Sequence, residues 1–375
     1  MTRPHHFFSY FPQFHPDPIN DRAWGEGFTD WDLIANLPDA DRNHFMPKRG
    51  QYDPSAPDYL LSLCSQLADA PLPNVGLMVY HYYFDGVHAL SGFEQQLLAQ
   101  PQNAPPFFLC WANETWSKRW IGLSEILIEQ RHRLQSALVQ EHASYLSQFF
   151  DLPTYHRIGN RPLFMLYDAQ ASTTLPQQMV MYREAFAALG HQPLIGACVS
   201  YPVSADQLSP YDFACEFEPR FFFNSRVSSA LSTWAARLKM HFPVLFEWIG
   251  TKRDHLRRRA GKRIFFYRDY LAVLADGSLE RLLRKSTGAL PLMRSAFLCW
   301  DNLPRYGDRS TSVKHEGIHA EMLSVLQSVS SDQDLPILIN SWNEWSEGAA
   351  LEPGMVYLPL REKFLAAVGS PTRAN

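Results

Sequence analysis

Short apolar runs recur along the chain and are separated by polar or amphipathic segments. Their length and their content of β-branched and aromatic residues are typical of buried strands. The predicted strands are 7–11, 75–83, 107–113, 162–167, 193–200, 213–219, 295–300 and 336–342. Helical patterns occupy 56–70, 90–100, 134–150, 175–189 and 311–328. Eight strands that alternate with helices in 375 residues predict an α/β fold of the (β/α)8 TIM barrel type.

Two of the connections between the predicted strands are long. Residues 12–74 follow the first strand, and residues 220–294 follow the sixth. Their apolar residues are scattered and no Gly/Ser-rich linker sets them apart, so we predict two insertions in a single barrel domain that spans 1–375. A doubly wound open sheet is the alternative, but no glycine-rich phosphate loop follows any predicted strand.

The last predicted strand ends in a pair of carboxylates. Glu344 and Glu347 follow the apolar run directly, and Trp342 and Trp345 flank them. Close carboxylates repel each other and desolvate poorly, so such a pair is unusual at the end of a buried strand. Glycosidic-bond chemistry needs two acids with different pKa values beside aromatic faces on which a sugar ring stacks. We predict that Glu344 and Glu347 are catalytic; two solvated loop glutamates are the alternative.

The other predicted strands also end in aromatic, acidic and amide side chains. In a (β/α)8 barrel the loops after the strands surround one cleft, where the chemistry takes place. We therefore predict a saccharide cleft at these strand ends. The predicted substrate-binding residues are Tyr10, His15, Trp24, His81, Tyr83, Trp111, Asn113, Glu114, Trp116, Glu216, Trp300, Asp301, Trp342, Asn343 and Trp345.

The bulk composition narrows the class of protein. Hydrophobic residues make up 46% and aromatic residues 14%, which supports a large core with aromatic surface left over. The formal charge of -4 argues against nucleic acid as a partner. No apolar run is long enough to span a membrane, and the first residues lack a secretory signal, so we expect a cytoplasmic protein. The five scattered cysteines are expected to be reduced.

Six motifs, in consistent order, resemble the WbsX-type proteins of bacterial surface polysaccharides. These proteins are related to glycoside hydrolase family 99, the endo-α-mannanases and endomannosidases. The resemblance covers about residues 8 to 360 and implies a (β/α)8 barrel. The motifs are 10–15 (YFPQFH), 24–31 (WGEGFTDW), 81–84 (HYYF), 111–116 (WANETW), 300–305 (WDNLPR) and 342–353 (WNEWSEGAALEP).

The resemblance also implies roles for the two glutamates. By analogy with the hydrolase family, Glu344 is the base that activates the sugar 2-hydroxyl, which then attacks its own anomeric carbon. Glu347 protonates the leaving oxygen and later activates water or an acceptor hydroxyl. No cofactor or metal is implied. Hydrolysis and glycosyl transfer, as in lipopolysaccharide or O-antigen biosynthesis, both stay open.

Three alternatives follow from the residues themselves. Glu114 follows Asn113 after an apolar run, so it is an alternative partner for Glu344 in a retaining pair. The segment from His315 to His319 matches the His-Glu-x-x-His zinc pattern, but it is predicted on the helix after the seventh strand, away from the cleft. An inactive sugar-binding protein is the alternative from another class, and the presence of both glutamates argues against it.

The most basic segment of the chain is 252–263, which holds seven Lys or Arg residues. A solvated surface is the ordinary interpretation of such a run. The functional interpretation is peripheral contact with the anionic inner membrane, where precursors are carried on lipid pyrophosphate. The expected partner is therefore an oligosaccharide or a lipid-linked saccharide.

Overall fold

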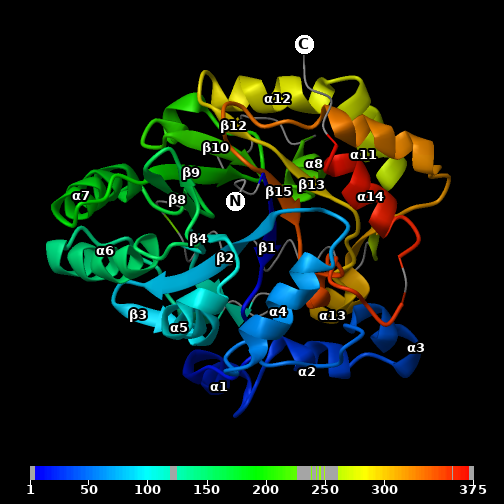
Figure 1. Ribbon diagram of the computed structural model, residues 1–375, viewed down its shortest axis with the longest axis horizontal. Helices are drawn as coiled ribbons and strands as arrows, with labels where there is room; N and C mark the ends of the chain where they lie inside the picture. The colour runs from blue at the N-terminus through cyan, green and yellow to red at the C-terminus, as the bar shows by residue number, and fades with distance from the viewer. Residues whose placement is uncertain are drawn as a thin grey trace.

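Parallel strands form the centre of the molecule, and helices surround them. The computed structural model describes residues 5–118, 125–225, 261–356 and 358–370, together with positions 238, 242, 245 and 249. The colour sequence in Figure 1 runs around this centre, from the helices near the N-terminus to those near the C-terminus. Most of the basic segment 252–263, namely 252–260, lies outside the described residues.

The strands follow one another around the sheet in chain order. Every pairing between them is parallel, and all eight predicted strands are present. In order they are β1 (His6–Tyr10), β2 (Val75–Phe84), β4 (Phe107–Trp111), β8 (Arg161–Leu166), β9 (Leu194–Val199), β10 (Phe213–Glu216), β12 (Leu292–Met293) with β13 (Ser295–Phe297), and β15 (Ile337–Asn340).

The seventh strand closes the barrel. β12 pairs with β10 on one side, and β13 pairs with β15 on the other. Only Arg294 lies between them, so β12 and β13 are two halves of one strand that touches both neighbours. The predicted insertion 220–294 therefore ends three residues too late, because β12 and Arg294 already belong to the barrel.

Helices cover the outer face of the sheet, as the sequence predicts for a (β/α)8 barrel. The helices of the outer layer are α4 (Tyr59–Ala68), α5 (Gly92–Ala99), α6 (Ser136–Phe150), α7 (Leu175–Ala188), α11 (Tyr267–Ala275), α12 (Ser278–Thr287), η6 (Ala320–Ser328) and α14 (Arg361–Val368). The prediction of one helix over 311–328 is wrong. Residues Thr311–Lys314 form β14, which pairs with β11 (Arg263–Phe266), and only η6 is helical.

Several short helices and strands lie in the loops that follow the barrel strands. The connection after β1 holds α1 (Pro18–Trp24), α2 (Asp30–Ala35), α3 (Asp39–Arg42) and η1 (Asn43–Phe45). The loops after the other strands hold β5 (Trp116–Ser117), β6 (Ile126–Ile128), α8 (Arg220–Asn224), α13 (Leu303–Tyr306), η5 (Gly307–Arg309) and η7 (Trp345–Glu347). Of these elements, α1, β5, β6, α8, α13, η5 and η7 contribute residues to the lining of the cavity described below.

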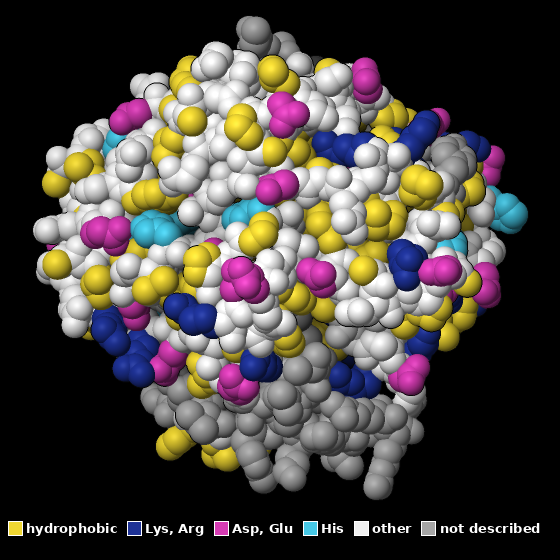
Figure 2. All heavy atoms as spheres, turned by 90° about the horizontal axis from the view of Figure 1, so that it is seen from below, with side chains coloured by type: hydrophobic (Ala, Val, Ile, Leu, Met, Phe, Trp, Pro, Cys, Tyr) yellow, Lys and Arg dark blue, Asp and Glu magenta, His cyan; other side chains and the backbone are white. Residues whose placement is uncertain are grey.

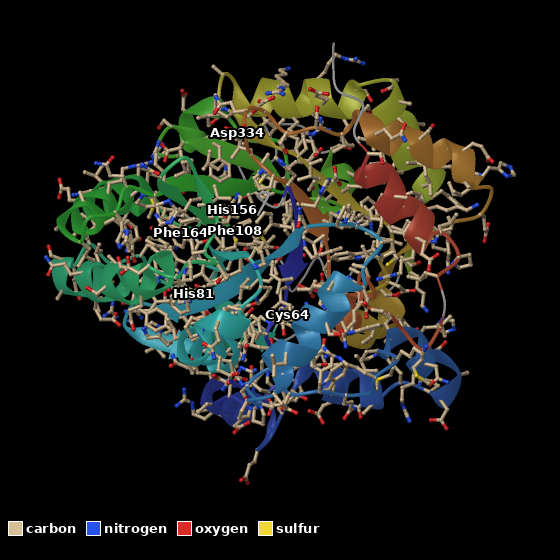
Figure 3. All side chains as sticks on the ribbon, in the orientation of Figure 1. Cys64, His81, Phe108, His156, Phe164 and Asp334 are labelled. Atoms are coloured by element: carbon tan, nitrogen blue, oxygen red, sulfur yellow. The ribbon has the colours of Figure 1, made fainter. Side chains whose placement is uncertain are left out.

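Aromatic side chains fill the lower part of the barrel, near the start of the strands. Phe7 packs against Phe108 and His156, with ring centroids 5.0 and 4.6 Å apart. Figure 3 places Phe108 and His156 close together in the centre of the molecule. Because rings fill this end, the interior is a packed core and a cavity can open only at the other end.

The outer surface mixes charges of both signs. On the face drawn in Figure 2, acidic and basic side chains are interspersed with hydrophobic ones, and neither sign gathers into a broad patch. Within the described residues, no helix has both the length and the apolar character that crossing a membrane requires.

A buried ion pair holds the closing strand. The Nε–H of Arg294 donates to Glu216 Oε2 over 2.8 Å, and Glu280 lies 3.2 Å from the other end of the guanidinium. Glu216, which the sequence predicts to bind substrate, is fully buried at the end of β10. It joins β10 to the seventh strand, because the backbone N–H of Ser295 also donates to it.

We predict that Arg294→Met destabilises the fold by about 3 kcal/mol or more, because it leaves the Glu216 carboxylate buried without its cation. Chemical denaturation measures the change. The exposed variant Arg281→Met is the matched control and should unfold like the parent. The double variant Glu216→Gln with Arg294→Met should recover part of the loss; a single variant as stable as the parent contradicts the prediction.

Candidate active site

The turn after β15 carries the two glutamates. The backbone leaves the strand at Asn340, forms the short helix η7 and ends at Gly348 with a φ of 57°. A side chain on Gly348 would meet the backbone oxygen of Asp301 at 2.6 Å, so glycine lets the turn pack against the loop after β13. This close contact fixes Glu344 and Glu347 at the mouth of the barrel.

Asn343 ties this turn to the first strand. Its side-chain Oδ1 accepts from the backbone N–H of Phe11 over 2.8 Å, and its Nδ2 donates to the Phe11 carbonyl over 2.8 Å. The hydroxyl of Ser341 accepts from the backbone N–H of Glu344 over 2.9 Å. Asn343 is predicted from the sequence to bind substrate. In the structure its side chain instead fixes the turn to the backbone of Phe11.

Arg305 joins both glutamates to the insertion after β1. Its guanidinium lies 2.7 Å from Glu347 Oε1, 3.6 Å from Glu344 Oε2 and 3.0 Å from Asp30 Oδ2. Its Nε–H donates to the hydroxyl of Ser346 over 2.8 Å, and that hydroxyl donates to Asp30. One buried cation thus faces three carboxyl groups from two distant parts of the chain.

A second arginine faces Glu347 from the loop after β10. Arg220 Nη2 lies 3.4 Å from Glu347 Oε1. The guanidinium also lies 5.9 Å from the ring centroids of Tyr167 and Trp300, a distance at which cation–π attraction operates. Among the described residues, Glu347 therefore has two cationic neighbours, whereas Glu344 has one, the longer contact with Arg305.

The charges of this cluster indicate that it holds one proton. Arg305 and Arg220 supply two positive charges against the three carboxyl groups of Asp30, Glu344 and Glu347. One bound proton makes the cluster neutral. Glu344 Oε2 is buried and has no hydrogen-bond partner among the described residues. Burial, together with the nearby Glu347, raises the pKa of Glu344 to about 8. Burial also raises the pKa of Asp30, against the opposing effect of Arg305.

Glu344, Glu347, Arg305 and Arg220 line a cavity of about 640 Å³, a size typical of small-molecule sites, whereas Asp30 is buried behind its lining. Glu344, Glu347 and Arg305 form its floor, and one wall is aromatic. Trp116 on that wall packs edge-on against Tyr82, with ring centroids 5.0 Å apart. Among the predicted residues, the cavity is lined by Glu344, Glu347, Trp24, Asn113, Glu114, Trp116 and Trp300.

The structure also brings to the cavity residues that the sequence analysis did not select. Tyr80 and Tyr82 line it from β2, Tyr167 from the end of β8, and Arg220 and Arg305 from the loops after β10 and β13. Tyr167 lies at the end of the predicted strand 162–167, and Arg305 lies in the motif 300–305. Both positions could therefore have indicated a place in the cavity.

Alternation along β2 directs His81 and Tyr83 away from the cavity, on the face opposite to Tyr80 and Tyr82. Figure 3 shows His81 on the side of the sheet toward α5 and α6, away from the centre. There His81 lies 2.9 Å from Glu94 and 2.8 Å from His142, measured from its two ring nitrogens. The Tyr83 hydroxyl donates to Glu141 over 2.6 Å. Both side chains attach helices to the sheet.

Three predicted tryptophans are buried in packing positions outside the cavity lining. Trp342 packs edge-on against Phe8, with ring centroids 5.2 Å apart. Trp345 donates through its indole N–H to Glu352, and Trp111 donates in the same way to the backbone of Tyr83. The remaining predicted residues outside the lining are Tyr10, His15, Glu216, Asp301 and Asn343.

The histidines of the zinc-like pattern do not share a helix, so the helical placement of this segment is wrong. His315 to His319 form a turn in which Gly317 has a φ of 74°. His315 Nε2 lies 2.8 Å from the carbonyl oxygen of Leu298. Within the part of the chain that is described, no three acidic, cysteine or histidine side chains are grouped to hold a metal ion.

A parallel barrel with carboxylates and aromatic rings at its strand ends is an architecture of carbohydrate-active enzymes. The chain belongs to the family described as Glycosyltransferase WbsX, whose model matches residues 7–368. It is 28% identical over 365 residues to the uncharacterized protein WxcX of Xanthomonas campestris pv. campestris strain B100. That match covers 92% of this chain and 46% of the relative, so the chain spans about half the length of the curated relatives it matches.

Two solved structures have the same fold. They are the GH99 endo-alpha-mannosidase from Bacteroides thetaiotaomicron and the same enzyme in complex with bis-tris-propane. The first has a TM-score of 0.53 and 15% sequence identity, covering 98% of this chain and 96% of that chain. The second has a TM-score of 0.52 and 16% identity with the same coverage. The (β/α)8 barrel predicted from the sequence is thus confirmed.

We predict that the free energy of unfolding of the Glu344→Gln variant increases relative to that of the parent as the pH rises. The folded protein keeps the Glu344 proton up to about pH 8, whereas the ordinary pKa of a glutamate is 4.5. Between these values the folded state binds more protons than the unfolded state, so ionisation lowers the parent's stability as the pH rises. Denaturation at several pH values measures the difference. The exposed variant Glu362→Gln is the control for loss of one carboxylate; a difference that does not grow with pH contradicts the prediction.

Proposed function

We propose that this chain breaks or transfers a glycosidic bond with retention of configuration, with Glu344 and Glu347 as its catalytic carboxylates. One observation carries the proposal: both glutamates leave a single turn, line one cavity and share the buried guanidinium of Arg305. The endo-α-mannosidase-like chemistry is supported by the family resemblance and by the common fold of the mannosidase structures.

The proposed reaction has two steps. Glu344 accepts the proton of the sugar 2-hydroxyl, whose oxygen bonds to the anomeric carbon while the bond to the leaving oxygen breaks. Glu347 gives its proton to that leaving oxygen. In the second step Glu347 takes a proton from water or an acceptor hydroxyl, which opens the ring formed in the first step and returns the proton to the 2-hydroxyl through Glu344. Water gives hydrolysis and a sugar hydroxyl gives transfer.

The number of protons bound to the pair agrees with this scheme. The reaction needs one proton on the two carboxyl groups, and the charge balance of the cluster favours one proton. In the resting protein this proton resides on Glu344, because burial raises the pKa of its carboxyl group to about 8. The scheme requires the proton to be on Glu347 when the first step begins, so we propose that binding of the substrate moves it there.

The aromatic wall provides the sugar platform in this proposal. Trp24, Trp116 and Tyr82 line the cavity, and Trp116 packs against Tyr82. Aromatic faces such as these stack on the apolar faces of sugar rings. Glu114 lines the same cavity and has the role of a hydrogen-bonding partner for sugar hydroxyls. It also remains the alternative acid in a pair with Glu344, and substitution separates the two assignments.

We predict that Glu344→Gln and Glu347→Gln each lower turnover by about 10² or more, because each removes a proton acceptor or donor without changing shape. Defined α-linked oligosaccharides and lipid-linked acceptors are the substrates, and mass spectrometry reads the products. Glu114→Gln is the matched comparison and should cost much less. Full activity in Glu344→Gln contradicts the proposal, and loss in Glu114→Gln with activity kept in Glu347→Gln transfers the acid role to Glu114.

We also predict that kcat/KM falls as the pH rises through about 8. Above that pH the pair loses its last proton, so no acid remains for the leaving oxygen whichever glutamate carries it. Initial rates at substrate concentrations well below KM give the profile. Activity that stays constant well above pH 8 would falsify the single-proton pair.

A further inference from the structure

We propose that the cavity wall beside the β11–β14 ribbon is a subsite for a phosphate or pyrophosphate group of the glycosyl substrate. This inference rests on the proposed function, because it places the anionic part of the substrate next to Glu347. It adds a substrate class: a sugar that is attached to a diphosphate.

Two arginines on this wall leave neighbouring backbone positions. The backbone N–H of Arg263, at the start of β11, donates to the carbonyl of Ser310 over 2.9 Å. Arg309, the last residue of η5, directly precedes Ser310 in the chain, so its backbone lies close to that of Arg263 at the start of the ribbon. Both line the cavity. Guanidinium groups present a planar fork of donors that matches the oxygens of phosphate, and two adjacent groups suit a doubly charged ligand.

The acidic residues of the cavity come from other parts of the chain. The glutamates in the lining are Glu114 after β4, Glu129 after β6, and the catalytic pair after β15. No described Asp or Glu between 217 and 311 lines the cavity, although that part of the chain supplies four of its arginines, Arg220, Arg263, Arg305 and Arg309. Arg220 and Arg305 are ion-paired with Glu347, and Arg131, which also lines the cavity, is paired with Glu129. The positive charge that this wall adds to the cavity is therefore that of Arg263 and Arg309.

A chain of aromatic side chains connects Arg220, which lies beside Glu347, to the β11–β14 ribbon. Trp300, whose ring lies 5.9 Å from the Arg220 guanidinium, packs against Phe223 at 6.1 Å. Phe223 stacks on Phe265 at 4.4 Å, and the Arg263 guanidinium lies 5.1 Å from the Phe265 ring. The wall is thus continuous from the glutamate that protonates the leaving oxygen to the two adjacent arginines.

An unused hydrogen-bond donor lies on the same wall. Trp300 lines the cavity and is only 4% exposed. Its indole Nε1–H has no acceptor among the described residues. A buried donor without a partner is costly, so it suits an oxygen of a bound ligand. Together with the arginines, this donor indicates an oxyanion rather than a neutral sugar at this wall.

Binding of inorganic pyrophosphate tests the proposal without requiring catalysis. Calorimetry on the full chain at low ionic strength, about 50 mM, keeps electrostatic attraction measurable. We expect the parent to bind and the double variant Arg263→Ser with Arg309→Ser to bind at least about tenfold more weakly, because it loses two charge-assisted contacts. The matched control, Arg268→Ser with Arg281→Ser, removes the same charge from residues outside the cavity lining and should bind like the parent.

Two results would overturn the subsite: a parent that does not bind pyrophosphate, or equal losses in the two double variants. Circular dichroism of each variant establishes that it is folded. Glu344→Gln should still bind pyrophosphate, so failure of the glycosidic chemistry and failure of the subsite are observed separately. Pyrophosphate binding with no turnover of any glycoside rejects only the catalytic proposal.

Two further ligands distinguish the sources of the diphosphate. Uridine diphosphate represents a nucleotide-linked sugar, and farnesyl pyrophosphate represents a lipid-linked one. The subsite is supported if one of these ligands binds more tightly than pyrophosphate does and if the Arg263 and Arg309 substitutions weaken that binding. The ligand that binds more tightly then identifies the source. Equal binding of all three supports recognition of the diphosphate alone. Binding of either ligand that is unaffected by the substitutions counts against this wall.

Discussion

The site depends on one buried cation. Arg305 contacts Asp30 from the insertion after β1 and both glutamates from the turn after β15, so a single guanidinium joins the beginning and the end of the barrel. A buried charge is costly unless it is paired, and here the carboxyl groups outnumber the cations. A bound proton relieves the surplus of negative charge, and in our proposal this proton is the acid that glycosidic chemistry requires.

The barrel provides the rigid part of this arrangement, and its loops provide the chemistry. Arg294 and Glu216 hold the closing strand, and Asn343 fixes the turn after β15 to the backbone of Phe11. These contacts lie below the cavity and position the residues above them. Loops after different strands then give the cavity walls of different character, one aromatic and acidic and one cationic. In our proposals the first wall holds the sugar and the second holds the diphosphate.

The sequence by itself determined the architecture and the position of the two glutamates that we propose to be catalytic. Strands of a parallel barrel are buried on both faces, so they appear as continuous apolar runs, and all eight could be found. Glu344 and Glu347 were recognisable because two nearby acids at the end of such a run repel each other and desolvate poorly, which is costly without a function. The helix predicted over 311–328 failed because β14 gains its partner, β11, from a segment about fifty residues earlier, which local periodicity does not reveal.

Only the tertiary structure decided which side chains face the cavity. In β2 every residue is buried, so the sequence holds no polar–apolar alternation to distinguish Tyr80 and Tyr82 from His81 and Tyr83. Closure of the barrel sets that choice, and shifting by one residue exchanges the two faces. The pairing of Arg305 with Asp30 likewise joins positions 275 residues apart. Such contacts depend on how the loops meet in space, and no local pattern encodes them.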